Sequence, residues 1–214
     1  STMYSIYVRE VCSLTDKSPW EGPVFATTLC SGPIIAPFTE NFDGPGWVQY
    51  VSTQNFGSVG PCWVTNPTPA IFNYMWLVNP NLLFSNNTGP SSDHTTGNGK
   101  YMATQTVAGS NTFAVLRSPQ IDLSAVSNPE LTFWYHMFGS GISMLEVEAK
   151  PVVGGAWTNI HTETGQQQTS SAAPWQSVSV SLSAYANQTI YIRFKGTRNS
   201  TSTQSAKIAI DDLS

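Results

Sequence analysis

Short runs in which apolar and polar residues alternate constrain the fold of this chain more than any other feature. Residues 175–182, 189–195 and 207–213 each place an apolar side chain at roughly every second position. A period of two is that of a β-strand with one buried face, whereas an amphipathic helix repeats about every 3.6 residues. Clusters of Gly, Pro, Ser and Asn separate the runs at spacings of about ten residues. The pattern therefore predicts an all-β protein, an antiparallel β-sandwich of two sheets.

The most apolar run is 131–139, which has turn-forming residues on both sides. Its length and composition predict a central strand that is buried on both faces. In the next run, 144–150, carboxylates alternate with apolar residues, so Glu146 and Glu148 share the outer face of a half-exposed strand. Such a pair is typical of a glycosidase, and equally of an ordinary solvent-facing strand. Residues 48–90 are rich in aromatics and interrupted by prolines, which predicts short strands and long loops.

Composition excludes some classes of partner. The chain has 214 residues and a net charge of -4, and 10% of its residues are charged, against about 25% in an average soluble domain. An acidic chain offers no basic field to a phosphate backbone, so we expect no nucleic-acid partner. No stretch approaches a membrane span of roughly 18 apolar residues, and no leader pattern opens the sequence. We expect an extracellular segment of a longer secreted or cell-surface protein, with its secretion signal and anchor elsewhere.

The chain has three cysteines. Cys12 and Cys30 fall in two predicted strands, 4–12 and 22–30, and adjacent antiparallel strands bring such residues within bridging distance. In an oxidising compartment we expect Cys12 and Cys30 to pair, the alternative being two buried free thiols. Cys62 is then the odd cysteine, for which burial as a small hydrophobic side chain is favoured over a partner outside this segment.

A run of turn-forming residues, 89–102, reads Gly-Pro-Ser-Ser-Asp-His-Thr-Thr-Gly-Asn-Gly-Lys-Tyr-Met. Its wording resembles the central signature of the MAM domain, an extracellular adhesion and assembly module. Segments 131–139 and 208–214 resemble two further parts of that family in the same order, so the resemblance spans residues 38–214. It implies a jelly-roll-like β-sandwich, an extracellular location, and adhesion or assembly with other protein chains or neighbouring copies of itself.

Residues 1–30 resemble the last two strands of a fibronectin type III-like domain, of the kind found in bacterial multidomain surface proteins. Prolines and isoleucines predict a stiff, extended linker at 31–37. We therefore expect fibronectin-like strands at 1–30, this linker, and a MAM-like sandwich at 38–214. The N-terminal strands also suit pairing with the sheet edge of a neighbouring copy, which predicts a repeat unit of an adhesin or fibre.

Several carboxylates indicate a structural cation. Asp93 in the turn, Asp43 or Glu40 near the start of the sandwich, and Asp211 or its neighbour Asp212 at the end fall in stretches that MAM domains place at one end of the fold. Because Ca²⁺ is held by several oxygen ligands, the resemblance implies a Ca²⁺ site that joins the first and last parts of the sandwich. In the alternative, Asp93 caps its own turn and Asp211 accepts hydrogen bonds from nearby amides.

The sequence lacks the common catalytic motifs, so we expect no enzyme. A carbohydrate-binding accessory module of a secreted enzyme is the alternative function, with cell-surface glycans as partners. Trp47, Trp63 and Trp76 lie in the irregular segment, and they are the candidate rings for stacking on sugars. In both interpretations the chain binds without reacting.

Overall fold

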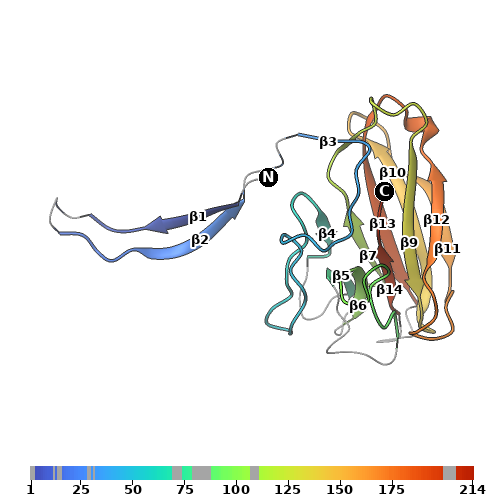
Figure 1. Cartoon of the computed structure of the whole chain (residues 1–214), viewed down its shortest axis with the longest axis horizontal. Coiled ribbons are helices and arrows are strands. Elements are labelled where there is room, and N and C mark those ends of the chain that lie inside the picture. Colours follow the sequence, from blue (N-terminus) through green and yellow to red (C-terminus); the bar gives the residue numbers. More distant parts are fainter. Residues whose placement is uncertain are drawn as a thin grey trace. The chain divides into compact units, whose positions relative to one another are not determined.

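The structure is a computed structural model that describes residues 3–11, 13, 16–27, 30, 32–68, 74–78, 88–106, 111–199 and 206–214. The chain forms two compact units, Ser1–Gly32 and Pro33–Ser214. Figure 1 shows both units, coloured along the sequence. Among the described residues, no helix has the length and hydropathy that a membrane span needs.

The first unit is a β-hairpin. Strand β1 (Met3–Val8) pairs antiparallel with β2 (Glu21–Thr27), so the expected pair of strands is present. In the connection, the guanidinium of Arg9 lies 4.4 Å from the centre of the Trp20 ring, a cation–π contact. The assignment of this unit to a fibronectin type III-like domain stays a prediction, because two strands are compatible with many folds.

The state of the cysteines differs from the expectation. Cys30 and Cys62 are both disulfide-bonded, while Cys12 lies outside the described residues. The expected Cys12–Cys30 bond involves a residue outside the described part of the chain and stays a prediction, whereas the interpretation of Cys62 as a free buried side chain is wrong. Spacing along strands carries no information about a turn such as that of Cys62, whose backbone is left-handed with a φ of 71°.

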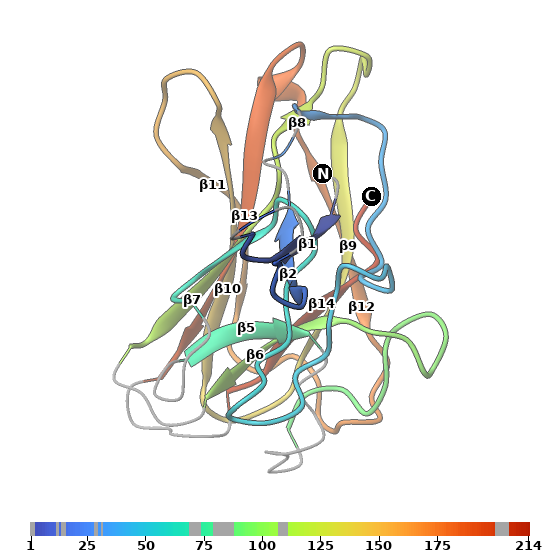
Figure 2. The same cartoon turned by 90° about the vertical axis from the view of Figure 1, so that its left-hand side faces the viewer.

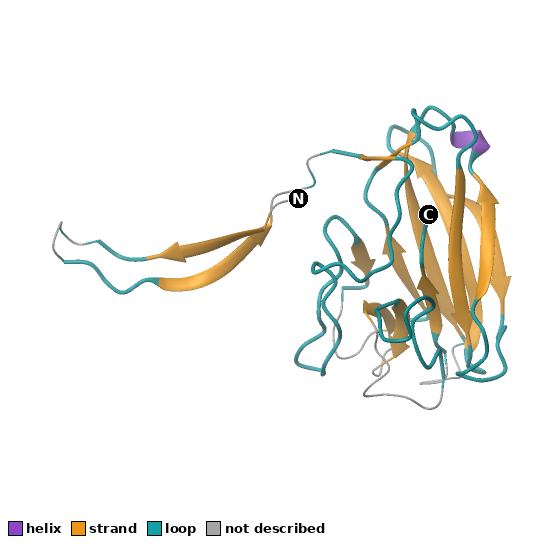
Figure 3. Ribbon diagram, viewed as in Figure 1, coloured by secondary structure: helices purple, strands orange, loops and turns teal. Residues whose placement is uncertain are grey.

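The second unit is a β-sandwich (Figure 3), with seven and five strands in its two sheets over the part that the structure describes. One sheet contains, in pairing order, β11 (Thr158–Thr164), β10 (Ile142–Pro151), β13 (Thr189–Arg198), β7 (Phe113–Arg117) and β4 (Val64–Asn66), with β8 (Ile121–Asp122) joined to β13 and β3 (Ile34–Ile35) joined to β8. The other contains β12 (Gln176–Ser181), β9 (Glu130–Met137), β14 (Ile208–Asp211), β6 (Met102–Thr106) and β5 (Tyr74–Val78). A 3-10 turn, η2 (Ser183–Tyr185), precedes β13. The predicted all-β sandwich is confirmed.

Alternation along the strands builds the core between the two sheets. Every second side chain of β13 is buried, including Ile190, Ile192 and Phe194. The ring of Phe194 meets that of Phe133, from the opposite sheet, edge to face with centres 5.2 Å apart. Full burial of such a side chain contributes about 1.5–3 kcal/mol. As predicted, the run 131–139 forms a central strand, β9, with β12 and β14 on its two sides.

The aromatic residues of the irregular segment belong to the core. Trp47, Trp63 and Trp76 are 3%, 6% and 0% exposed. The rings of Trp47 and Trp63 lie 5.5 Å apart, and Phe42 meets Trp47 edge to face at 4.8 Å. The indole N–H of Trp76 donates to the carbonyl of Ala114 at 3.1 Å. The expectation that these tryptophans stack on sugars is therefore wrong, because their faces are used in packing.

Part of the expected linker is a strand. Ile34–Ile35 forms β3 and pairs in parallel with β8. The amide of Ala36 donates to the carbonyl of Asp122 at 3.0 Å, and Ala36 itself is buried. The chain from residue 33 on therefore belongs to the sandwich unit, where backbone hydrogen bonds hold it extended.

Candidate functional site

The acidic turn, residues 88–101, crosses the outer face of the five-stranded sheet. The amide of Gly89 donates to the carbonyl of Phe138, directly after β9, at 2.8 Å. The indole of Trp175 donates to the carbonyl of Ser92 at 3.3 Å. Figure 2 shows this loop in green, leading into β6. Hydrogen bonds to two other segments thus fix the course of a loop that is almost free of regular structure.

Asp93 organises the acidic turn from within, and it is 5% exposed. Its Oδ2 accepts hydrogen bonds from the amide and the hydroxyl of Thr96 at 2.7 and 2.9 Å, and its Oδ1 accepts one from the amide of Gly99 at 2.8 Å. Burial raises the pKa of Asp93, but these hydrogen bonds outweigh burial and hold the pKa below its ordinary value. The alternative in which Asp93 caps its own turn is confirmed.

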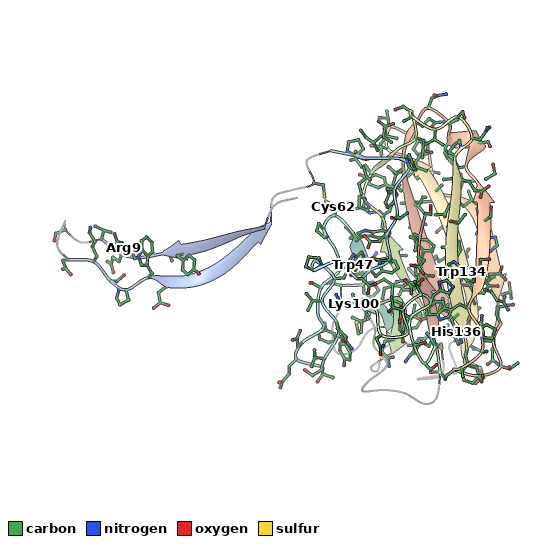
Figure 4. The ribbon with its side chains drawn as sticks, in the orientation of Figure 1. Arg9, Trp47, Cys62, Lys100, Trp134 and His136 are labelled. Carbon is green, nitrogen blue, oxygen red and sulfur yellow. The ribbon has the colours of Figure 1, made fainter. Side chains whose placement is uncertain are left out.

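His94 clamps the acidic turn to the last strand. Its ring stacks on Trp134 of β9, labelled in Figure 4, with centres 3.8 Å apart. Its amide donates to Asp211 Oδ2 at 2.9 Å, and its Nδ1 lies 2.7 Å from Asp212 Oδ2. The hydroxyl of Thr95 contacts the same Nδ1 at 3.2 Å and the same carboxylate. In a hydrolase triad the hydroxyl and the acid use opposite ring nitrogens, so this cluster lacks the geometry of one.

Asp43 reaches the acidic turn from residues 38–47, here called the entry segment. Its Oδ1 accepts a hydrogen bond from the amide of Lys100 at 2.7 Å, and the ammonium of Lys100 donates to the carbonyl of Asp43 at 3.1 Å. A Cβ on Gly99 would lie 2.7 Å from Asp93 Oδ2, 2.9 Å from Asp43 Oδ1 and 2.9 Å from Thr96 Oγ1. Glycine therefore leaves a small space here that oxygens of two carboxylates and one hydroxyl surround.

Asp211 lies among other carboxyl groups and is 2% exposed. Its two oxygens accept backbone amides at 2.9 Å each, as the capping alternative predicts. Burial, together with the charges of Asp212 and Asp93, raises the pKa of Asp211 to about 7. Burial likewise raises the pKa of Glu40, whose Oε1 accepts the amide of Phe42 at 2.9 Å. Buried carboxyl groups that cost this much to ionise are an environment in which a cation is stabilised.

Four of the carboxylates expected to hold Ca²⁺ come together in pairs. Asp43 and Asp93 flank Gly99. The charge of Asp93 contributes to the raised pKa of Asp211, and the charge of Asp43 contributes to the raised pKa of Glu40. Among the described residues, no three side chains of His, Cys, Asp or Glu form a group that could hold a metal ion. A cation beside Gly99 would therefore take oxygens from Asp43 and Asp93, with hydroxyl or backbone oxygens in place of the other two carboxylates.

Backbone hydrogen bonds join the entry segment to the last strand. Glu40 and Leu213 form an antiparallel bridge in which each amide donates to the other carbonyl at 2.9 Å. Thr132 and Ser214 exchange hydrogen bonds in the same way, at 2.8 and 2.9 Å. The first and last parts of the sandwich therefore lie side by side.

The outer face of the seven-stranded sheet carries a groove that sequence reasoning missed. Its volume is about 530 Å³. Its lining includes Phe113, Arg117, Trp157, Arg193 and Lys195. Alternation along β7 and β13 indicates which residues face outward, but the sequence gives no sign that these two strands are neighbours.

Glu146 and Glu148 face outward on the same sheet, and both are ion-paired. Arg193 donates to the two oxygens of Glu148 at 2.7 and 3.0 Å, and Lys195 lies 2.7 Å from Glu146. A glycosidase requires one carboxyl group that is protonated and a second that is an accessible nucleophile or base. Two carboxylates neutralised by neighbouring cations favour the ordinary-strand interpretation.

Fold and surface together define a β-sandwich with one covered and one open outer face. The model of the family "MAM domain, meprin/A5/mu" matches residues 56–214, and the chain belongs to this family. A stretch of 97 residues is 34% identical to Neuropilin-1a of Danio rerio, covering 44% of this chain and 10% of that protein. The chain thus spans about a tenth of the length of this curated relative.

Two solved structures are similar in fold. The K1 cleaved adhesin domain of Lys-gingipain from Porphyromonas gingivalis W83 has a TM-score of 0.51 at 17% identity, covering 82% of this chain and 95% of that chain. The K3 cleaved adhesin domain of the same protein has a TM-score of 0.48 at 15% identity, covering 83% and 97%. At such identities the likeness concerns the β-sandwich alone.

Proposed function

We propose that this chain is a non-catalytic adhesion and assembly module of a larger extracellular protein, either secreted or held at the cell surface. Its partners are other protein chains or neighbouring copies of itself. Membership of the MAM family supports the proposal, and one structural observation carries it. In the described part of the chain, the groups suited to chemistry are used inside the fold: His94 and Asp212 in a clamp, Asp93 in a cap. Such a molecule interacts with a partner through non-covalent contacts of its surface.

Self-association is the most direct test. Beads coated with the chain are mixed, and their aggregation is followed by light scattering, with albumin-coated beads as the control. Aggregation of the coated beads alone is the expected result. A chain that leaves the beads dispersed, and that stays monomeric in sedimentation at millimolar concentration, would contradict assembly between copies.

A repeat unit of an adhesin or fibre is the finer form of this proposal. Among the described strands, β1 and β2 pair with each other alone, so each offers a second edge to a strand from a neighbouring copy. Fibres in electron micrographs, lost when a proline replaces Ser5 in β1, are the expected result. A proline removes a backbone donor from the strand, and fibres that persist unchanged would argue against strand addition.

We infer that a structural Ca²⁺ is held beside Gly99. Asp43 and Asp93 reach this point from segments far apart in the sequence, and none of the ion pairs among the described residues includes either of them. Carboxylate and hydroxyl oxygens are the ligands that Ca²⁺ prefers. When bound there, the ion would neutralise both carboxylates and hold the entry segment against the acidic turn.

Melting in Ca²⁺ and in a chelator tests the cation. At a concentration about 100 times its dissociation constant, Ca²⁺ adds about 2.7 kcal/mol, which raises the Tm of a domain of this size by roughly 5–10 °C. Asp43→Asn should lose this response, and the control Asp122→Asn should keep it. Equal Tm values for the unmodified chain in Ca²⁺ and in chelator would rule out the cation and leave the adhesion proposal standing.

Glycan binding is a second candidate, and the open groove favours it. The tryptophans first expected to stack on sugars are buried, but Phe113 and Trp157 place other rings in the groove. Asn66 adds an exposed amide beside them. Rings next to hydrogen-bonding groups are the usual composition of a sugar site.

A further inference from the structure

Outward-facing side chains form rows that cross the seven-stranded sheet. In one row, Glu148 on β10 is opposite Arg193 on β13, Arg193 is opposite Arg117 on β7, and Arg117 is opposite Val64 on β4. Side chains directly opposite each other in a sheet lie about 5 Å apart at their Cβ atoms. Two arginines therefore stand side by side at the centre of this face, and Glu148 binds one of them.

The next row likewise begins with a carboxylate on β10 that lies opposite a cation on β13. Glu146 is opposite Lys195, Lys195 is opposite Val115, and Val115 is opposite Asn66. Glu146 is ion-paired with Lys195, as Glu148 is with Arg193. Both carboxylates thus lie on β10, and the cations and the amide extend from there towards β4.

Cations outnumber carboxylates on this face. The outward positions of β7, β10 and β13 carry four cations and two carboxylates, Arg117, Lys150, Arg193 and Lys195 against Glu146 and Glu148, and Asp122 on β8 adds a third carboxylate. The face therefore has a net charge opposite in sign to that of the whole chain, which is -4. Among the described residues, the ion pairs on this face use Arg193 and Lys195, so Arg117 and Lys150 are not ion-paired with a carboxylate.

Aromatic rings hold the arginines in place. The guanidinium of Arg117 lies 4.4 Å from the centre of the Tyr191 ring, and that of Arg193 lies 4.1 Å from the centre of the Trp157 ring. The ring attracts the guanidinium and holds it in place, and the loss of hydration costs little because a guanidinium is only weakly hydrated. At the β7 side of the groove, Phe113 is 45% exposed. The groove thus combines oriented donors with an apolar surface.

We propose that this groove binds an acidic oligosaccharide, a chain of sugar rings that carry carboxylate or sulfate groups. Arg117 donates charge-assisted hydrogen bonds to the acid group, Phe113 contacts the apolar face of a sugar ring, and Asn66 bonds to hydroxyls. A second copy of this chain is a poorer occupant, because its acidic cluster at Asp93 and Asp211 is buried. The inference rests on the proposal that the chain binds without catalysis, and it specifies the glycan candidate.

Isothermal titration calorimetry on the complete 214-residue chain tests the inference with matched ligands. Hexagalacturonate is compared with its methyl ester, which has the same rings and no charge. Sulfated dextran oligosaccharide is compared with unmodified dextran. We expect one acid or both to bind at least about tenfold more tightly than the neutral partner, and to weaken as NaCl is raised. If only one of the two acidic ligands binds more tightly than its neutral partner, that ligand identifies the preferred acid group as carboxylate or sulfate.

Three variants locate the site. Arg117→Gln should lower the affinity by about tenfold or more, since it removes a charged hydrogen bond while the Tm stays close to that of the parent chain. Phe113→Ala should weaken acid and ester alike. Arg9→Gln is the matched control, because Arg9 lies over Trp20 at 4.4 Å but on the hairpin. Its affinity should equal that of the parent chain.

The outcomes separate this inference from the function on which it rests. Equal binding of acid and ester, lost in Phe113→Ala, would overturn the acidic ligand and leave glycan binding intact. Tighter binding of polyglutamate than of either acidic sugar would replace the sugar by an acidic peptide. Affinity unaffected by both groove substitutions would overturn the groove. No binding to any ligand, in a chain whose coated beads still aggregate, would overturn this inference alone.

Discussion

The two outer faces of the sandwich are built from strands with the same alternation of buried and outward side chains. They differ in whether other parts of the chain cover them. On the five-stranded sheet, Trp134 is covered by the ring of His94, and His136 packs against Trp175. On the seven-stranded sheet, Lys195 and its neighbours line an open groove. The covered face uses its polar groups to bind the protein's own loops. We infer that covering supplies stability, and that the uncovered face is available for a partner.

Asp93→Ala breaks the covered face most severely. It removes three part-buried hydrogen bonds and leaves the amides of Thr96 and Gly99 without that acceptor. A hydrogen bond to a charged group contributes about 1.5–3 kcal/mol, so we expect the loss of these bonds to lower the free energy of unfolding by about 3 kcal/mol in denaturant titrations. Asp122→Ala, which removes an exposed cap on Ser124, should cost much less. Equal losses in the two variants would mean that the acidic turn is not structural.

Gly99→Ala tests the same face by filling space instead of removing a bond. The added methyl group would meet oxygens of Asp93, Asp43 and Thr96 at 2.7–2.9 Å. Overpacking of this kind costs about 1–3 kcal/mol, which thermal unfolding would detect. Gly44→Ala is the control, since its nearest neighbour, the Trp47 side chain, lies at 3.7 Å. Similar Tm values for the two variants would contradict the crowded geometry around Gly99.

The pH dependence of stability sharpens the comparison at Asp211, measured in chelator. From its ordinary pKa of 3.8, burial raises the folded-state value to about 7. Between these values the folded chain keeps a proton that the unfolded chain has lost, so the stability from this group falls as pH rises and is gone above pH 7. The free energy of unfolding of the parent, relative to that of Asp211→Asn, should therefore fall from pH 4 to pH 7. A constant difference would refute the raised pKa.

His136 is a second titrating group in the same window, and it acts in the opposite direction. Burial lowers its pKa from 6.5 to about 4. The unfolded chain then holds the extra proton, so the stability from His136 rises with pH across this range. Because His136 is present in both chains, it cancels from the difference between the parent and Asp211→Asn.

The open face should contribute least to stability. Lys195 and Glu146 form an ion pair at 2.7 Å whose side chains are 29% and 20% exposed. Pairs near the surface contribute about 0–1 kcal/mol, so the coupling energy from a double-mutant cycle of Lys195→Gln and Glu146→Gln should fall in that range. A coupling above about 2 kcal/mol would show that this face is also built for stability.

The sequence predicted what depends on neighbours along the chain. The period of two located β13, and an apolar run of strand length located β9, because both are local patterns. The turn formers of residues 89–102 marked a tight loop, and the acidic residue within it, Asp93, does cap that loop. The meeting of Asp43 with Asp93 also agrees with the expectation, although it came from the family resemblance and not from spacing.

The sequence failed where residues distant along the chain had to be brought together. Burial of Trp47 and Trp63 follows from a loop folding onto the sheets, and no periodicity records such an event. The disulfide state of Cys62 has the same origin. The groove appears only when β7 is placed beside β13, which brings Arg117 next to Arg193. Pairing between strands is set by the tertiary fold, so these features required coordinates.

The antiparallel bridge between Glu40 and Leu213 determines how the sandwich responds to tension. If residues 33 and 214 are pulled apart, the load falls on these hydrogen bonds one after another, as in unzipping, and not on all of them together, as in shear. The entry segment would peel away first, carrying Asp43 off the acidic turn and drawing Phe42 out of the core. In single-molecule pulling this would register as a small early extension at low force, the behaviour of an elastic joint between anchored molecules.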